Sequence, residues 1–226
     1  MSFNIENYKL IIFDCDGVIL DSNKIKTNAF YKSAESFGKD AATALVEYHT
    51  CNGGISRYEK FTYFLEKVIS CLNIEEQKAY LDKLLTDYAS FVKQGLLSCS
   101  ITQELDVLRE KTKDACWIIA SGGDQNELRE VFRKRGIASL FDGGIFGSPD
   151  DKYLILQREI DRIKPQGPIL FLGDSKYDYE VAKHNDIDFI FIHQWTEVKG
   201  WAQWVEQEQI KSASEVRDII TFETSM

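Results

Sequence analysis

Residues 9–22 read Lys-Leu-Ile-Ile-Phe-Asp-Cys-Asp-Gly-Val-Ile-Leu-Asp-Ser, an apolar run that ends in two carboxylates, Asp14 and Asp16. A strand that is buried on both faces of a parallel sheet is expected to be apolar throughout. Two neighbouring carboxylates also repel each other unless a cation or a proton lies between them. The stretch therefore predicts a buried strand over 10–13 that delivers both acids to a metal-assisted site, of the kind used for phosphoryl transfer.

Three further apolar runs have the length of strands, and helical patterns alternate with them. This alternation predicts an α/β fold with a doubly wound, Rossmann-like parallel sheet that helices cover on both faces. Because ligands bind at the carboxyl ends of such strands, the polar residues that follow the runs should converge on one crevice. The four predicted strands are 10–13, 116–120, 169–172 and 189–192.

The segment between the first two strands is too long for a single crossover helix, and its apolar residues repeat at helical spacing. We therefore predict an all-helical cap domain over 23–94. It is inserted into a core made of 1–22 and 95–226. Gly95 is expected to end the last cap helix.

Composition limits the partners and the location of the protein. The 226 residues carry a formal net charge of −9 and no long basic run, which argues against nucleic acid and anionic membranes as partners. No stretch has the composition of a signal peptide or the length of a membrane span. The five cysteines show no CxxC spacing and are most simply reduced thiols. We expect a cytoplasmic protein, either a monomer or a homodimer.

Asp14 and Asp16 have a spacing that suits nucleophilic catalysis at phosphorus. Asp14, at the strand end, can attack phosphorus to form an aspartyl-phosphate. Asp16 would protonate the leaving alcohol and afterwards deprotonate the attacking water. The alternative is an ordinary surface turn, because Asp-Gly pairs are common there.

A second acidic pair, Asp174 and Asp178, follows the predicted strand 169–172. Mg²⁺ is usually bound through one or two carboxylates together with substrate phosphate. Asp14 and Asp174 could supply those carboxylates, and Asp178 would lie near the metal directly or through water. Asp174 could instead be the N-cap of the next helix, although this would not explain its match to Asp14 on another strand.

Two further groups could bind a phosphoryl oxygen. Ser121-Gly122-Gly123 follows the predicted strand 116–120 and precedes a helix, so its hydroxyl and free N–H groups could form an anion site. Lys152 is a compact cation that could offset charge between Asp14 and the phosphoryl group. The alternatives are a plain strand-to-helix turn and a solvated surface lysine.

Together these elements resemble the haloacid dehalogenase-like hydrolase superfamily, and the inserted cap is similar to its phosphoglycolate phosphatase and β-phosphoglucomutase branch. Order and spacing match over nearly the whole chain. The motifs that carry the resemblance are Phe13-Asp14-Cys15-Asp16-Gly17-Val18, Ile119-Ala120-Ser121, Lys152, and Gly173-Asp174-Ser175-Lys176-Tyr177-Asp178.

The resemblance implies roles for these residues. Asp14 would be the nucleophile and Asp16 the general acid and base, with Ser121 and Lys152 as phosphate ligands. Dehalogenases of this fold lack the second aspartate, because a halide leaving group needs no general acid, so Asp16 favours a phosphatase. The resemblance also implies a Mg²⁺ ion, held by Asp14, the main-chain carbonyl of Asp16, and Asp174, with Asp178 in support.

The function expected from these residues is a Mg²⁺-dependent phosphomonoesterase that acts on a small-molecule phosphate ester, such as a sugar or sugar-acid phosphate. A phosphosugar mutase is one alternative, but Lys26 stands where such mutases tend to have His, and Gly173 where they more often have Glu. A non-catalytic binding or regulatory member is another, but it would be expected to lose Asp14, Asp16 or Lys152.

The cap segment 48–59 is polar and rich in glycine, and we predict that it is a substrate-specificity loop. The planar fork of Arg57 suits a carboxylate or a second phosphate of the substrate. The alternative is an exposed arginine in the first turn of a helix. His49, a lone histidine, is expected to be structural.

Overall fold

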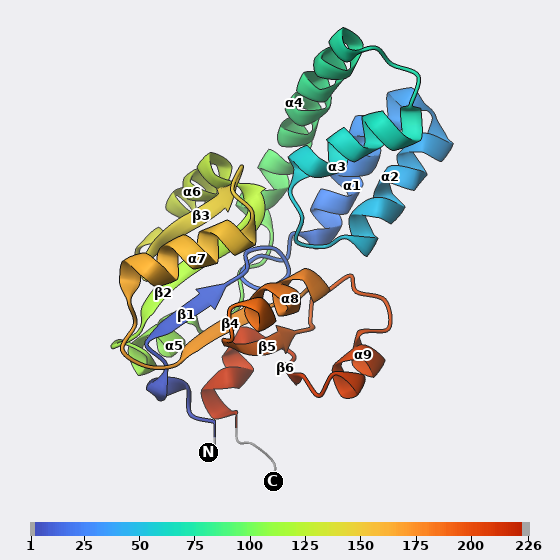
Figure 1. Cartoon of the computed structure of the whole chain (residues 1–226). Helices are drawn as coiled ribbons and strands as arrows, with labels where there is room; N and C mark the ends of the chain where they lie inside the picture. The colour runs from blue at the N-terminus through green and yellow to red at the C-terminus, as the bar shows by residue number, and fades with distance from the viewer. Residues whose placement is uncertain (1–2, 223–226) are drawn as a thin grey trace.

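β1 (Leu10–Phe13) is an inner strand of a six-stranded parallel sheet with the order β3-β2-β1-β4-β5-β6 (Figure 1). Its four side chains are fully buried; Ile11 and Phe13 belong to the apolar cluster on one face of the sheet and the other two to the cluster on the opposite face. Burial on both faces explains why the run is apolar at every position. The computed structural model describes residues 3–222.

The doubly wound parallel α/β fold is confirmed, and each of the four predicted strands is present. Three of them run beyond the predicted residues: β2 (Cys116–Asp124), β4 (Ile169–Gly173) and β5 (Asp188–Ile192). The sequence does not reveal the two edge strands, β3 (Gly144–Ser148) and β6 (Lys211–Ala213). β3 contains two glycines and β6 has three residues, so neither carries a recognisable strand pattern.

Helices cover both faces of the sheet. α5 and α6 contribute to the apolar cluster on one face, and α7 and α8 to the cluster on the other. Within residues 3–222, no helix combines the length and the apolar composition needed to cross a membrane. The core helices are α5 (Leu105–Lys111), α6 (Gln125–Lys134), α7 (Lys152–Ile163), α8 (Lys176–His184) and α9 (Trp201–Gln207), with shorter helical turns at Ile5–Asn7, Ala138–Leu140 and Val216–Thr221.

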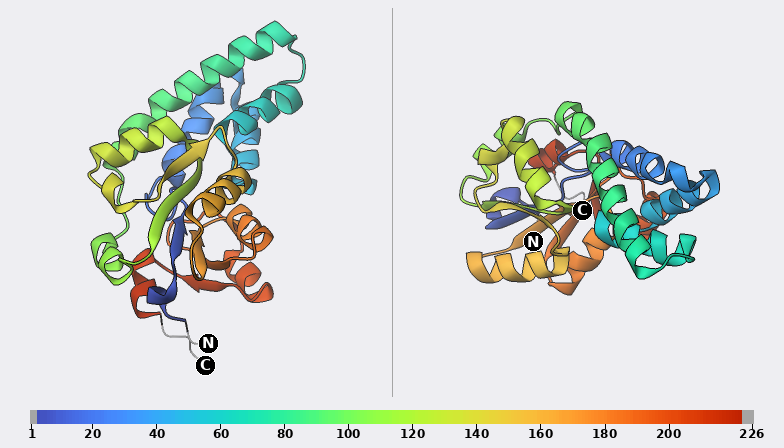
Figure 2. Two further views of the ribbon diagram at one scale, coloured as in Figure 1. Left: turned by 60° about the vertical axis from the view of Figure 1, so that its left-hand side comes forward. Right: turned by 90° about the horizontal axis from the view of Figure 1, so that it is seen from above.

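The helices of the predicted cap segment gather beyond the end toward which β1 points, as Figure 1 and Figure 2 show. α1 packs against both α2 and α4. The Phe30 ring lies 5.1 Å from the Phe61 ring and 4.5 Å from the Tyr88 ring, so one aromatic cluster joins three helices. The cap elements are α1 (Asn23–Ala34), α2 (Lys39–Cys51), α3 (Arg57–Tyr63), α4 (Ile74–Ser98), the 3-10 turn Glu35–Phe37 and the π-helical segment Phe64–Ile69.

Gly95 lies inside α4, so the prediction that it ends this helix is wrong. A Cβ atom at Gly95 would lie 2.6 Å from Cγ2 of Ile25, so the glycine permits the close approach of α1 and α4. α4 ends at Ser98, where Arg135 of the core donates a 2.9 Å hydrogen bond to the main-chain oxygen of Leu96. We propose that the cap domain extends to the end of α4 rather than to residue 94.

Candidate active site

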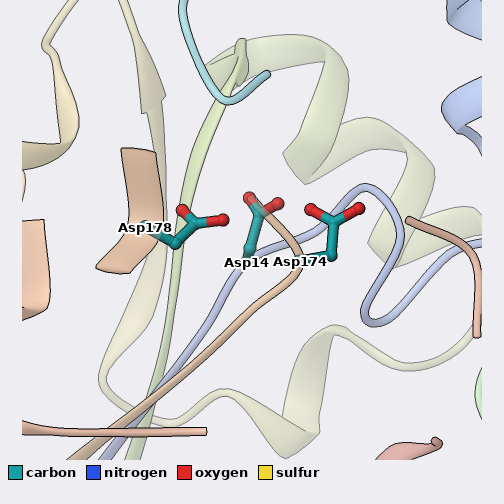
Figure 3. Close-up of side chains that lie close together, drawn as sticks. All are labelled: Asp14, Asp174 and Asp178. Atoms are coloured by element: carbon teal, nitrogen blue, oxygen red, sulfur yellow. The ribbon is translucent and has the colours of Figure 1, made fainter. Parts of the chain in front are cut away.

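Three carboxylates from separate elements meet at the carboxyl end of the sheet (Figure 3). Asp14 directly follows β1, Asp174 follows β4, and Asp178 lies in the first turn of α8. One oxygen of each lies within 4.8 Å of the others. β1 and β4 are neighbours, and the Asp14 N–H donates to the main-chain oxygen of Leu172 at 2.9 Å. The sheet itself therefore brings these acids together.

Lys152, the first residue of α7, contacts two of the three acids. Its Nζ atom lies 2.8 Å from Oδ1 of Asp14 and 2.5 Å from Oδ1 of Asp178, and all three side chains are buried. Burial alone would lower the pKa of the Lys152 ammonium, but the two carboxylates raise it above its usual value. Lys152 therefore stays charged and compensates only part of the negative charge of the cluster.

The negative charge that Lys152 does not compensate raises the pKa values of the acids in the cluster. Burial raises the pKa of Asp14 to about 7, because Lys152 only partly offsets burial and the charges of Asp178 and Asp16. Burial and the neighbouring charges of Asp14 and Asp178 likewise raise the pKa of Asp174 well above its usual value. Hard oxygen donors with excess negative charge suit Mg²⁺, and a divalent cation would relieve their repulsion. The residues present therefore fit a magnesium site.

Asp16 lines the cavity above this cluster and has two close partners. Its Oδ2 atom lies 2.5 Å from Nζ of Lys26 in α1, and its Oδ1 atom accepts a 2.6 Å hydrogen bond from the Ser22 hydroxyl. Burial alone would raise the pKa of Asp16, but Lys26 and Ser22 lower it overall. Asp16 is therefore a carboxylate in this arrangement, and Lys26 is its counter-ion.

The Ser121-Gly122-Gly123 segment lies differently from the prediction. β2 continues through it to Asp124 and α6 begins at Gln125, so the segment precedes a helix as predicted but belongs to the strand rather than to a turn after it. The buried Ser121 hydroxyl accepts a 3.0 Å hydrogen bond from the Gly123 N–H, whereas Gly122 lines the cavity. A Cβ atom at Gly122 would lie 2.3 Å from the main-chain oxygen of Gly54. This glycine therefore lets a loop of the cap rest directly on the core.

Arg57 forms an ion pair with the core, so it is not an exposed arginine. Its Nη2 atom lies 2.6 Å from Oε1 of Glu127 in α6, and its guanidinium lies 4.8 Å from the centre of the Tyr88 ring. The neighbouring Tyr58 hydroxyl donates to Oδ2 of Asp124 at 2.9 Å. The start of α3 is thus attached to the start of α6, and cap and core are joined at this point.

A cavity of about 70 Å³ lies between the cap and the core. Its core side carries carboxylates, whereas its cap side carries nitrogen groups, including those of Lys60 and His49. Sequence reasoning missed Lys60, although it lies one helical turn after Arg57 and hence on the same side of α3. Of the predicted site residues, Asp14, Asp16, Arg57, Gly122 and Asp174 line this cavity, and Ser121, Lys152 and Asp178 lie outside its lining.

The chain has a doubly wound parallel sheet whose strand ends carry aspartates, and an inserted set of helices lies over them. These features define a class of α/β enzymes that work at the carboxyl edge of the sheet. The chain belongs to the haloacid dehalogenase-like hydrolase family, whose model matches residues 8–186. The predictions of this family and of an enzyme are therefore confirmed.

Individual relatives agree with this assignment. The chain is 26% identical over 189 residues to the "Phosphorylated carbohydrates phosphatase" of Thermotoga maritima, covering 80% of this chain and 83% of that protein. Its fold is similar to that of a candidate phosphoglycolate phosphatase from Lactobacillus plantarum, with a TM-score of 0.71 and 16% identity over 95% of this chain and 99% of that one. A β-phosphoglucomutase from Clostridium difficile gives a TM-score of 0.69 and 17% identity over 93% and 92% of the two chains.

Proposed function

We propose that the chain is a Mg²⁺-dependent phosphomonoesterase that hydrolyses a small organic phosphate through an aspartyl-phosphate intermediate. The observation that carries this proposal is the close placement of Asp14, Lys152 and Asp174 beneath a cavity that Asp16 also lines. A nucleophilic carboxylate needs nearby positive charge to receive an anionic phosphoryl group, and a second group must move the proton. Each of these groups is present, which favours a catalytic member of the family over a non-catalytic one.

Two displacements at phosphorus make up the proposed reaction. In the first, an Asp14 oxygen attacks phosphorus, and the bond between phosphorus and the alcohol oxygen of the substrate breaks. The alcohol takes a proton from the carboxyl group of Asp16, which is protonated for this step and is left as the carboxylate that pairs with Lys26. In the second, the Asp16 carboxylate takes a proton from water as the water oxygen attacks phosphorus. Phosphate leaves and Asp14 is restored.

Mg²⁺ would be held by Asp14, Asp174 and the main-chain carbonyl of Asp16. When bound, it would neutralise phosphoryl oxygens and so lower their repulsion from the carboxylates. Asp178 would support the site, since its carboxylate already accepts a 2.7 Å hydrogen bond from Ser175 and pairs with Lys152. Lys152 keeps its charge next to Asp14 and thereby stabilises the ionised nucleophile between turnovers.

We propose a sugar or sugar-acid phosphate as the substrate, which the printed description of the Thermotoga maritima relative supports. The cavity of about 70 Å³ is well below the roughly 300–1,000 Å³ of sites for drug-sized ligands, which favours a short substrate. It also favours hydrolysis over the mutase alternative, because a mutase must hold a bisphosphorylated sugar in two orientations. A cytoplasmic location is supported by the five free thiols.

Phosphate release from a panel of sugar, polyol and hydroxy-acid phosphates tests this function. With Mg²⁺ present, Asp14→Asn should lower turnover by at least about 10⁴-fold, the scale found when a catalytic nucleophile is removed. EDTA should abolish turnover and added Mg²⁺ should restore it. Asp40→Asn is the matched control, because Asp40 is exposed on α2, away from the cavity.

The same assay separates the alternatives. Isomerisation that depends on a bisphosphate, without net phosphate release, would indicate a mutase. If the wild type hydrolysed neither the panel nor acetyl phosphate, and Asp14→Asn made no difference, a non-catalytic protein would be the better explanation.

A further inference from the structure

Lys60, in α3, is a buried lysine without a carboxylate partner in the part of the chain that the structure describes. It is 2% exposed and lines the cavity between the cap and the core. Lys26 and Arg57 of the same wall each have a carboxylate partner, at 2.5 and 2.6 Å. Within residues 3–222, no acidic oxygen lies within ion-pair distance of the Lys60 ammonium. Burying an uncompensated charge costs free energy. A bound anion from outside the chain would therefore stabilise the charged form of Lys60.

A series of hydrogen bonds holds the Lys60 amine in place. Its Nζ atom lies 2.8 Å from Nδ1 of His49, whose Nε2 atom lies 3.0 Å from the Thr27 hydroxyl. The Thr27 hydroxyl donates to Oε2 of Glu197 at 2.6 Å. Because Thr27 gives its only hydroxyl proton to Glu197, it accepts from His49 Nε2–H, and this leaves Nδ1 as the acceptor for Lys60.

His49 orients Lys60 but does not neutralise it. Burial, together with the charges of Lys60 and Lys26, lowers the pKa of His49 well below its usual value, so the ring is neutral at neutral pH. A neutral imidazole can accept a hydrogen bond from an ammonium group but supplies no negative charge. The positive charge of Lys60 is therefore left facing the cavity.

We propose that the Lys60 ammonium binds a carboxylate of the substrate while the core reacts with a phosphate at its other end; this inference rests on the proposed phosphatase function. Because Lys26 and Arg57 are already compensated, the cap wall offers one free positive charge among residues 3–222. That charge matches a carboxylate monoanion better than a second phosphate dianion. The cavity of about 70 Å³ also favours a substrate whose two anionic groups lie close together. The substrate class is therefore a short phosphorylated hydroxy acid.

The acidity of Lys60 agrees with a missing counter-ion. Burial lowers its pKa to about 7, and the Lys26 ammonium adds to this effect, while nearby carboxylates oppose it. A carboxylate bound at Lys60 would raise its pKa again and fix the proton. The charged and titratable groups that act on Lys60 or share the cavity with it are Lys26 of α1, His49 of α2, Arg57 and Glu59 of α3, Tyr88 of α4, and Asp14, Asp16, Asp174 and Glu197 of the loops after β1, β4 and β5.

A matched pair of phosphate esters tests the proposal. Phosphoglycolate carries the carboxylate, and hydroxyethyl phosphate has a neutral hydroxymethyl group in its place. In the wild type with Mg²⁺, kcat/KM should be about 10- to 100-fold higher for phosphoglycolate, the factor expected from one charge-assisted hydrogen bond. Lys60→Met keeps the apolar stem and removes the charge. It should erase the preference by lowering phosphoglycolate hydrolysis far more than hydroxyethyl phosphate hydrolysis.

Controls keep the test decisive. Lys67→Met changes an exposed lysine in the segment that follows α3 and should retain the preference. Lys60→Gln, which keeps a donor for His49, should lose the preference as Lys60→Met does and serves if the methionine variant does not fold. The carboxylate site would be overturned if the wild type hydrolysed both esters equally, or if the Lys60 variants lost equal activity toward both. Either result would leave the phosphatase proposal standing. A wild type that hydrolyses neither ester nor acetyl phosphate would overturn the phosphatase proposal itself.

Discussion

Lys26 and Lys60 lie in the same cavity wall, yet their surroundings give them opposite acid strengths. Burial lowers the pKa of both ammonium groups, but Asp16 more than offsets it at Lys26, whose pKa rises above its usual value. Lys60 has no such partner among the described residues, and its pKa falls to about 7. One lysine therefore keeps its charge over the physiological range, whereas the other titrates within it.

This difference predicts a pH-dependent preference between the two esters. The ratio of kcat/KM for phosphoglycolate to that for hydroxyethyl phosphate should be constant below about pH 7 and fall toward equality at higher pH, because Lys60 loses its proton. The ratio cancels groups that act on both esters, Asp14 included. Lys60→Arg should make the ratio independent of pH, since a guanidinium stays charged. A wild-type ratio that is unchanged between about pH 6 and 9 would contradict the role of Lys60.

How far single residues could be predicted depends on what fixes their positions. Asp14 and Asp174 were predictable because they follow strands of one parallel sheet, and the sheet decides where strand ends meet. Lys60 was not, because a lysine on an amphipathic helix is usually solvated, and only the folded cap buries it. Ser121 fits the expected residue type, but its hydroxyl accepts a hydrogen bond from Gly123 of the same strand.

Among the elements, the contact between β2 and the loop that precedes α3 depends on small residues on both sides. Gly54 has φ of +82°, a conformation that other residues adopt with strain. Gly122 faces its main-chain oxygen so closely that a Cβ atom would stand 2.3 Å away. Main-chain atoms cannot move aside as a flexible side chain can, so the position of the cap on the core depends on Gly122.

Gly122→Ala should therefore impair closure of the cap over the site. We expect kcat/KM to fall by about 100-fold, the scale associated with a misplacement of about 1 Å at a reacting centre. The melting temperature should change little, because the cap can move away to relieve the contact. In the matched variant Gly53→Ala, the new methyl group would meet only Cβ of Ser175, at 3.3 Å, and the loss should be much smaller. Equal losses in the two variants would argue against this explanation.

The elements themselves were predictable where burial dictates their composition. β1 is apolar at every position because both of its faces are covered, whereas β6 at the edge has three residues, of which only Ala213 is buried. The end of α4 was not predictable, because the side chain that bonds to its last turn is Arg135, far away in the sequence. Local sequence signals indicate where a helix starts. The end of α4 depends instead on a residue that is distant in the sequence, and helix ends are less well defined.

At the scale of the whole molecule, several polar contacts attach the cap to the core, the Lys26–Asp16 ion pair among them. On one side Arg57 pairs with Glu127, and on the other Thr27 bonds to Glu197 in the loop after β5. Interfaces of this kind between parts of one chain permit relative movement. A lid that opens must release such contacts to admit substrate and form them again to exclude water.

Variants of Arg57 and Glu127 test whether their ion pair holds the cap closed. They also test the prediction that Arg57 binds substrate. If the pair acts as a latch, Arg57→Met and Glu127→Gln should each lower kcat/KM for hydroxyethyl phosphate by about 3- to 30-fold, and the double variant should lose no more than either, because contacting residues are coupled. If Arg57 instead binds substrate, its variant should lose far more than Glu127→Gln, and the two losses should multiply. The exposed pair Lys134 and Glu130, on the same helix, supplies the control cycle and should show no coupling, since surface ion pairs contribute little.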